Sequence, residues 1–178
     1  MSLNILNHKG ETSYITPPWI YKNLGEFDLD PCCPVRGNPK VAKRWITKTD
    51  WSGCGLSQEW VGRVWLNPPY GRETGLWMEK LSAHGNGIAL IFARTDNKWF
   101  QEFVFGAADG ILFLKGRITF LDVEGEEYKY NAGAPSCLIA YGQDNLKALT
   151  DSGLNGSIVH LKPHLEGVGG QMKKGGAE

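Results

Sequence analysis

The clearest chemical signal in the chain is a short loop, Asn67-Pro68-Pro69-Tyr70, which directly follows the apolar run Val64-Trp65-Leu66. Two consecutive prolines fix two backbone φ angles, so we expect the loop to be stiff. Neither proline carries an N–H, and we expect both proline carbonyls to remain free acceptors. Asn67 adds a side-chain carbonyl beside them. The loop is therefore suited to holding an amino group through its two N–H bonds.

The chemistry that such a loop favours is transfer of a group to an aryl amine. An aryl amine is a poor nucleophile because its lone pair spreads into the ring. Hydrogen bonds to Asn67 Oδ1 and the Pro68 carbonyl would pull the nitrogen toward tetrahedral geometry and stabilise positive charge on it, as an oxyanion hole does for negative charge. Losing one such contact should cost roughly 3 kcal/mol. If the aryl amine belongs to a nucleic-acid base, such as adenine, Tyr70 would stack on that base, which must first be flipped out of the duplex.

A structural interpretation of the same loop is a tight turn between a strand and a helix, because proline and asparagine are common in turns. The surrounding pattern provides both elements. Helices are expected over residues 73–84 and 97–105, and buried strands over 64–66, 88–93, 111–114 and 137–141. This alternation predicts an α/β fold with a mainly parallel sheet and helices on both faces. Ligands bind at the carboxyl ends of such strands, which is where the loop begins.

The composition of the two ends of the chain indicates a single domain between flexible termini. We expect residues 14–165 to form one domain, residues 1–13 a flexible arm and residues 166–178 a disordered tail. Within the domain, a helix is expected from Pro17 to about Leu24, with Thr16 as its N-cap. Further expectations are a strand at 27–30, an irregular segment at 32–62, a hairpin at 118–131, a helix at 145–150 and an edge strand at 158–161.

Composition sets limits on the function. The chain has 178 residues, 42% of them hydrophobic, with 19 basic and 19 acidic side chains. Zero net charge argues against a strongly basic nucleic-acid binder, although charges segregated on one face would permit DNA binding. No apolar run is long enough to cross a membrane and no secretory signal is visible, so we expect a cytoplasmic protein. The four cysteines lack paired CxxC spacing, so we expect no metal site and buried or half-buried thiols.

Six sequence blocks, in order, resemble the bacteriophage-type DNA N-6-adenine methyltransferase family, the compact phage relatives of Dam methylases. The resemblance covers about residues 13–142. It implies a compact Rossmann-like methyltransferase fold, S-adenosyl-L-methionine as the methyl donor, adenine in DNA as the target, and a phage or prophage gene expressed in a bacterial host. The blocks are YITPPWI (14–20), GEFDLDPC (25–32), GRVWLNPPYG (62–71), ALIFARTDNKWF (89–100), ADGILFLKGRITFL (108–121) and APSCLIAYG (134–142).

The resemblance also implies a donor site. Tyr14, Thr16 and Pro17 are similar to the family's N-terminal cofactor motif, which embraces the methionine part of the donor. Asp30 and Pro31 resemble the acidic strand end of the first methyltransferase motif, where the aspartate holds the donor's amino group. The chain departs from that motif, because no Gly-x-Gly follows Asp30.

Five further residues are candidates for binding rather than chemistry. Asp50 is a candidate for the ribose or the adenine amino group of the donor, or is a solvated loop residue. Arg94 and Asp96 follow the central strand and either position the target base or a phosphate or form a structural pair. Lys115 and Arg117 are candidate phosphate contacts, with solvated surface as the alternative. Since no separate recognition domain is visible, target recognition is expected from loops within 32–60 or 116–133, or from a second subunit.

The same loop is compatible with related functions. The same loop occurs in methyltransferases that act on a glutamine side chain of proteins, and related loops serve cytosine amino groups. A different class is a catalytically silent module that binds the donor or DNA. The shortened glycine turn after Asp30 is the one sequence feature that favours the silent module.

Overall fold

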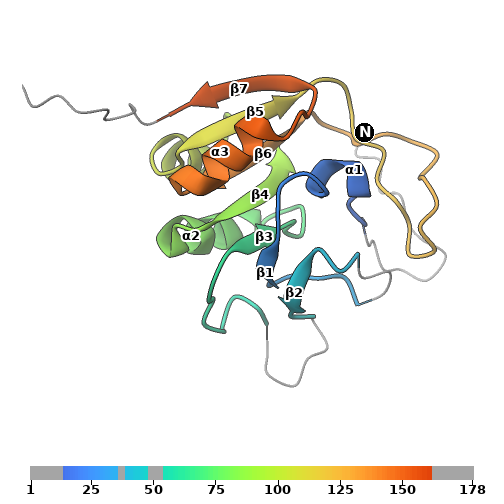
Figure 1. Cartoon of the computed structure of the whole chain (residues 1–178), viewed down its shortest axis with the longest axis horizontal. Coiled ribbons are helices and arrows are strands. Elements are labelled where there is room, and N and C mark those ends of the chain that lie inside the picture. Colours follow the sequence, from blue (N-terminus) through green and yellow to red (C-terminus); the bar gives the residue numbers. More distant parts are fainter. Residues whose placement is uncertain (1–13, 36–38, 48–53, 162–178) are drawn as a thin grey trace, which may run out of the picture.

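The computed structural model describes residues 14–35, 39–47 and 54–161. Its centre is a seven-stranded sheet, surrounded by short helices (Figure 1). The strands are β1 (Phe27–Asp30), β2 (Ala42–Trp45), β3 (Val64–Leu66), β4 (Gly87–Phe92), β5 (Gly110–Leu114), β6 (Ser136–Tyr141) and β7 (Gly156–His160). Their order across the sheet is β2-β1-β3-β4-β6-β5-β7.

The sheet is mixed, which corrects the prediction of a mainly parallel sheet. The pairings of β1 with β2, β1 with β3 and β3 with β4 are parallel. Those of β4 with β6, β5 with β6 and β5 with β7 are antiparallel. The connection from β5 to β6 contains no helix. A parallel return needs a crossover, usually a helix, so β6 runs back between β4 and β5 instead.

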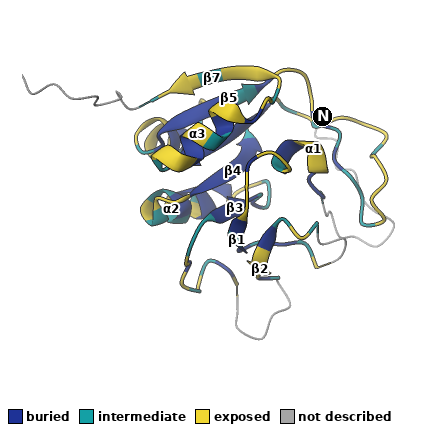
Figure 2. Ribbon diagram, viewed as in Figure 1, coloured by how far each residue is buried: buried dark blue, intermediate teal, exposed yellow. Residues whose placement is uncertain are grey.

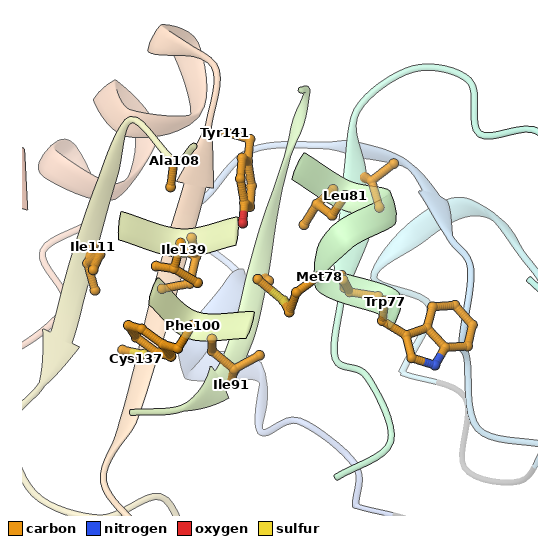
Figure 3. Packing of buried hydrophobic residues seen from close by; sticks show 14 of the residues in the cluster. Trp77, Met78, Leu81, Ile91, Phe100, Ala108, Ile111, Cys137, Ile139 and Tyr141 are labelled. Atoms are coloured by element: carbon orange, nitrogen blue, oxygen red, sulfur yellow. The ribbon is translucent and has the colours of Figure 1, made fainter. Parts of the chain in front are cut away.

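Helices cover both faces of the sheet, as the sequence predicted. Helix α2 (Thr74–His84) and the π-helix η1 (Phe100–Phe105) contribute to one buried cluster, and α1 (Pro18–Tyr21) and α3 (Gln143–Asp151) border the other. Figure 3 shows the first cluster, in which Met78 and Leu81 of α2 point toward Ile91 and Ile139 of the sheet. The central strands are buried while the outer side of α3 and most of β7 are exposed (Figure 2). The α/β class is thus confirmed.

Several local predictions were right and others need correction. Helix α2 begins one residue later than expected and ends at Gly85, whose φ of 73° suits a glycine. Helix α1 is shorter than expected, and its N-cap is Pro17, so Thr16 is not the cap. The segment expected as a helix over 97–105 is mostly the π-helix. The expected hairpin forms a single bridge, Leu121 to Glu127, rather than two strands.

In its described part, the segment expected to be irregular contains a strand, β2. The predicted arm at 1–13, the predicted tail at 166–178 and Asp50 lie outside the described residues. Within the part of the chain that the structure describes, no helix is long and apolar enough to span a membrane.

Candidate active site

The carboxyl ends of β1, β3 and β4 lie side by side at one edge of the sheet, because these strands are parallel neighbours. They deliver Asp30, Asn67 and Phe92 to that edge. The chain passes from β1 outward to β2 and then returns across β1 to β3. Strand order therefore changes direction between β1 and β3, the position where open α/β sheets bind ligands.

The side-chain amide of Asn67 is held by hydrogen bonds at both ends. Its Nδ2 donates to the Tyr14 carbonyl over 3.3 Å and to the Thr16 hydroxyl over 3.1 Å. Its Oδ1 accepts a bond of 3.3 Å from the Tyr70 hydroxyl. An oxygen with two lone pairs can accept a second donor. The arrangement presents Oδ1 as an acceptor in a fixed direction.

The two proline carbonyls of the loop differ, which corrects the expectation that both are free. The Pro69 carbonyl accepts a bond of 2.8 Å from the Thr74 hydroxyl, and the Gly71 N–H donates to the same hydroxyl over 3.0 Å. Among the described residues, no donor reaches the Pro68 carbonyl. Thr74 at the start of α2 thus fixes the end of the loop and leaves Pro68 with an available acceptor.

Aromatic rings pack against one another beside Asn67, whose Oδ1 accepts from the Tyr70 hydroxyl. Tyr70 stacks on Phe92 with ring centroids 4.1 Å apart and planes 12° apart. Tyr14 meets Tyr70, Phe120 and Tyr128 at centroid distances of 6.2, 5.4 and 5.7 Å. Burial raises the pKa of Tyr70 far above its usual value, so its hydroxyl stays protonated and remains a donor. The site has rigid apolar walls suited to a flat ring.

The carboxylate of Asp30 is buried, with only 5% of the residue exposed. Its Oδ1 accepts a bond of 3.1 Å from the Cys32 N–H, and no ion pair reaches it from the described residues. Burial raises the pKa of Asp30 to about 7, and the Cys32 hydrogen bond offsets part of that shift. A buried carboxylate without a cation is costly, so this group fits a cationic ligand.

The described candidate residues differ in where the structure places them. Tyr14, Thr16, Asp30, Asn67 and Tyr70 are brought together at the site by the contacts above. Pro17 and Pro31 are buried beside it. Four candidates are exposed: Arg94, Asp96, Lys115 and Arg117. None of them forms an ion pair with another described residue. The structural pair considered for Arg94 and Asp96 is therefore not seen.

These exposed basic residues share the edge of the site. Strand β5 is antiparallel to β6, which is antiparallel to β4, so β4 and β5 run in the same direction. Arg94 follows β4 and Lys115 follows β5. Both therefore lie at the carboxyl edge. The chain after Lys115 continues along this edge to Leu121, which bridges to Ile15 next to Tyr14 (Figure 1).

Comparison with known families agrees with this geometry. A model of the DNA N-6-adenine-methyltransferase (Dam) family matches residues 6–160 of the 178-residue chain. The chain belongs to the Dam family. The resemblance inferred from the sequence blocks is thus confirmed at the level of the family. No curated protein and no solved structure matched this Dam-family chain.

Some residues at the site of this Dam-family protein escaped the sequence reasoning. The Cys32 thiol, interpreted only as a half-buried group, donates to the Asn67 backbone carbonyl over 3.1 Å. Phe120 and Tyr128 join the aromatic wall from a segment that begins about 50 residues beyond the loop. The alternation of apolar and polar residues in Ile118-Thr119-Phe120 indicates a buried side chain for Phe120. Another thiol expected to be at least half-buried, Cys54, is exposed.

Proposed function

We propose that this Dam-family chain transfers a methyl group from S-adenosyl-L-methionine to the exocyclic N6 amino group of adenine in DNA. The observation that carries the proposal is the orientation of Asn67. Its amide nitrogen is bound to Tyr14 and Thr16, so its oxygen is available at the sheet edge, and the next residue, Pro68, has a carbonyl that no donor reaches among the described residues. Two neighbouring acceptors match the two N–H bonds of an amino group.

The residues of the loop account for activation of the amine. Hydrogen bonds from the amino group to Asn67 Oδ1 and the Pro68 carbonyl draw the nitrogen lone pair out of conjugation. The same acceptors stabilise the positive charge that develops on nitrogen, in a site whose orientation is fixed before reaction. Both acceptors are neutral and neither acts as a strong base, so the surplus proton passes to water after transfer.

The site fits the proposed donor. S-adenosyl-L-methionine supplies an electrophilic methyl group on a sulfonium ion and carries an ammonium and a carboxylate. The buried, uncompensated carboxylate of Asp30 matches the ammonium. The sheet, with β1 to β5 running in one direction and helices on both faces, supports a compact Rossmann-like methyltransferase fold.

DNA as the substrate is supported by the position of the exposed cations. Arg94, Lys115 and Arg117 are exposed near the carboxyl edge that holds Asn67. Phosphate contacts made by such residues fix the register of a protein on a duplex. The target adenine is paired within the duplex, so it enters the aromatic site by base flipping. Tyr70, backed by Phe92, offers its ring as a stacking surface.

The test is transfer of labelled methyl from S-adenosyl-L-methionine to unmethylated DNA, with wild type and Asn67→Ala side by side. We expect label in N6-methyladenine for wild type and at least a hundredfold lower rate for the variant, by analogy with loss of an oxyanion-hole donor. Asn67→Asp, which keeps the acceptor but loses the Nδ2 donor, is the matched control.

Other outcomes identify other functions. Label in N4-methylcytosine would indicate a cytosine amino target. Label in a glutamine-containing peptide, with none in DNA, would indicate a protein substrate. Donor binding without transfer to either substrate would indicate a silent binding module. Each of these results contradicts the proposal.

A further inference from the structure

Asn67 is bound by two segments that are distant in sequence. Its side-chain nitrogen contacts the Tyr14 carbonyl and the Thr16 hydroxyl, and its backbone carbonyl accepts the Cys32 thiol. A reversed amide would place Oδ1 against the Tyr14 carbonyl, two acceptors facing each other. The Tyr14 carbonyl, which can only accept, therefore selects the end of the amide that carries nitrogen, and the Thr16 hydroxyl gives that nitrogen a second acceptor that holds it in place.

Thr16 is well placed to hold this orientation. It is only 2% exposed, so its hydroxyl lies in a position that water reaches poorly. On one side Ile15 exchanges two backbone hydrogen bonds of 3.0 Å with Leu121. On the other side Pro17 has its φ fixed at −64°. The backbone of Thr16 is thus constrained on both sides, which fixes the point from which its hydroxyl reaches Asn67.

We propose that Thr16 is a positioning residue, which acts through Asn67 by holding its amide nitrogen in place so that Oδ1 stays aimed at the target amino group. The inference rests on the proposed function and extends it. The resemblance places Thr16 at the methyl donor, whereas the structure places its hydroxyl oxygen on Asn67. The two roles affect different kinetic constants. A misplaced Asn67 lowers kcat, and a lost donor contact raises KM for the donor.

Thr16→Val separates these roles because valine keeps the shape and removes the acceptor. We expect kcat to fall at least about tenfold, which corresponds to one lost hydrogen bond of about 1.4 kcal/mol. The dissociation constant of S-adenosylhomocysteine should change less than about twofold. Thr16→Ser keeps a hydroxyl and should restore kcat. A weaker donor analogue complex with unchanged kcat would overturn the proposal.

A second measurement does not depend on activity. The side-chain amide protons of Asn67, assigned in NMR spectra by their loss in Asn67→Ala, should exchange slowly with solvent in wild type. In Thr16→Val we expect their exchange to be at least about tenfold faster, and in Thr16→Ser close to wild type. Equal exchange in Thr16→Val and wild type would overturn the proposal even if Thr16→Val is poorly active.

The two measurements also distinguish this inference from the proposed function. A wild-type protein that methylates no DNA would overturn the function. Faster exchange in Thr16→Val would then still support the contact between Thr16 and Asn67. Circular dichroism of Thr16→Val and Thr16→Ser provides the folding control, since a general loss of structure would accelerate exchange across the whole chain rather than at Asn67.

Discussion

The Tyr70 hydroxyl donates a hydrogen bond of 3.3 Å to Oδ1 of Asn67, the oxygen proposed to receive the target amino group. The phenol therefore occupies one lone pair of this acceptor before substrate binds. The Tyr70 ring lies against Phe92, so its hydroxyl and its ring have separable roles.

Substitution at Tyr70 should distinguish these roles. Tyr70→Phe removes one neutral hydrogen bond, worth about 0.5–1.5 kcal/mol, so we expect kcat to change less than about tenfold. Tyr70→Ala removes the stacking surface, worth about 1–3 kcal/mol per base, and should weaken DNA binding by about 5- to 150-fold. Steady-state kinetics and DNA binding assays measure the two effects. Equal losses in both variants would show that the ring does not contact the base.

The exposed cations at the site edge should contribute through phosphates. For Arg94→Ala, Lys115→Ala and Arg117→Ala, each lost phosphate contact should reduce the slope of log K for DNA against log salt concentration by about one. Donor binding should be unaffected. Lys147→Ala is the control, because Lys147 is an exposed cation of α3, which packs on a face of the sheet, and it is paired with Asp151. Identical slopes for all four variants and wild type would place DNA elsewhere.

The sequence indicated which candidate residues lie close together better than it indicated the directions of the strands. The loop at Asn67 follows a short apolar run, and strand ends at one edge bring Asp30 and Asn67 together without any knowledge of side-chain contacts. The direction of β6 depends instead on the connection before it, residues 115–135, whose aromatic residues gave no helical period. A pattern of buried strands does not encode strand direction, so the mixed sheet was missed.

Long-range hydrogen bonds were also beyond the sequence. Thr16 was expected as an N-cap because threonine commonly has that role, but its hydroxyl accepts from Asn67, 51 residues away. Pro17 takes the cap position without a side-chain bond. Residue preference is a local property, whereas the partner of a buried hydroxyl is set by tertiary packing.

Thr74 should stabilise the loop through its side chain. The Thr74 hydroxyl donates to the Pro69 carbonyl and accepts from the Gly71 N–H, and the residue is only 5% exposed. Thr74→Val leaves both groups without this partner and should lower the free energy of unfolding by about 1–3 kcal/mol. Thr74→Ser retains the hydroxyl and serves as the control. Urea unfolding measures the difference, and equal midpoints for the two variants would contradict the role.

Asp30 should make stability and donor binding respond to pH in opposite senses. Burial raises the pKa of Asp30 to about 7 from its ordinary value of 3.8, so the folded state retains a proton that the unfolded state loses. The contribution of Asp30 to stability is therefore greatest below about pH 4 and declines as pH rises to about 7.

Asp30→Asn removes this ionisation. Relative to wild type, the variant should gain up to about 4 kcal/mol in unfolding free energy between pH 4 and pH 8. A cationic ligand requires the ionised carboxylate, so wild-type affinity for S-adenosylhomocysteine should rise from pH 6 to pH 8. The variant should bind weakly, with little pH dependence. Urea unfolding and calorimetry at matched pH measure both effects. Parallel stability profiles for wild type and Asp30→Asn would show that Asp30 ionises normally, and an unchanged affinity in the variant would remove Asp30 from the donor site.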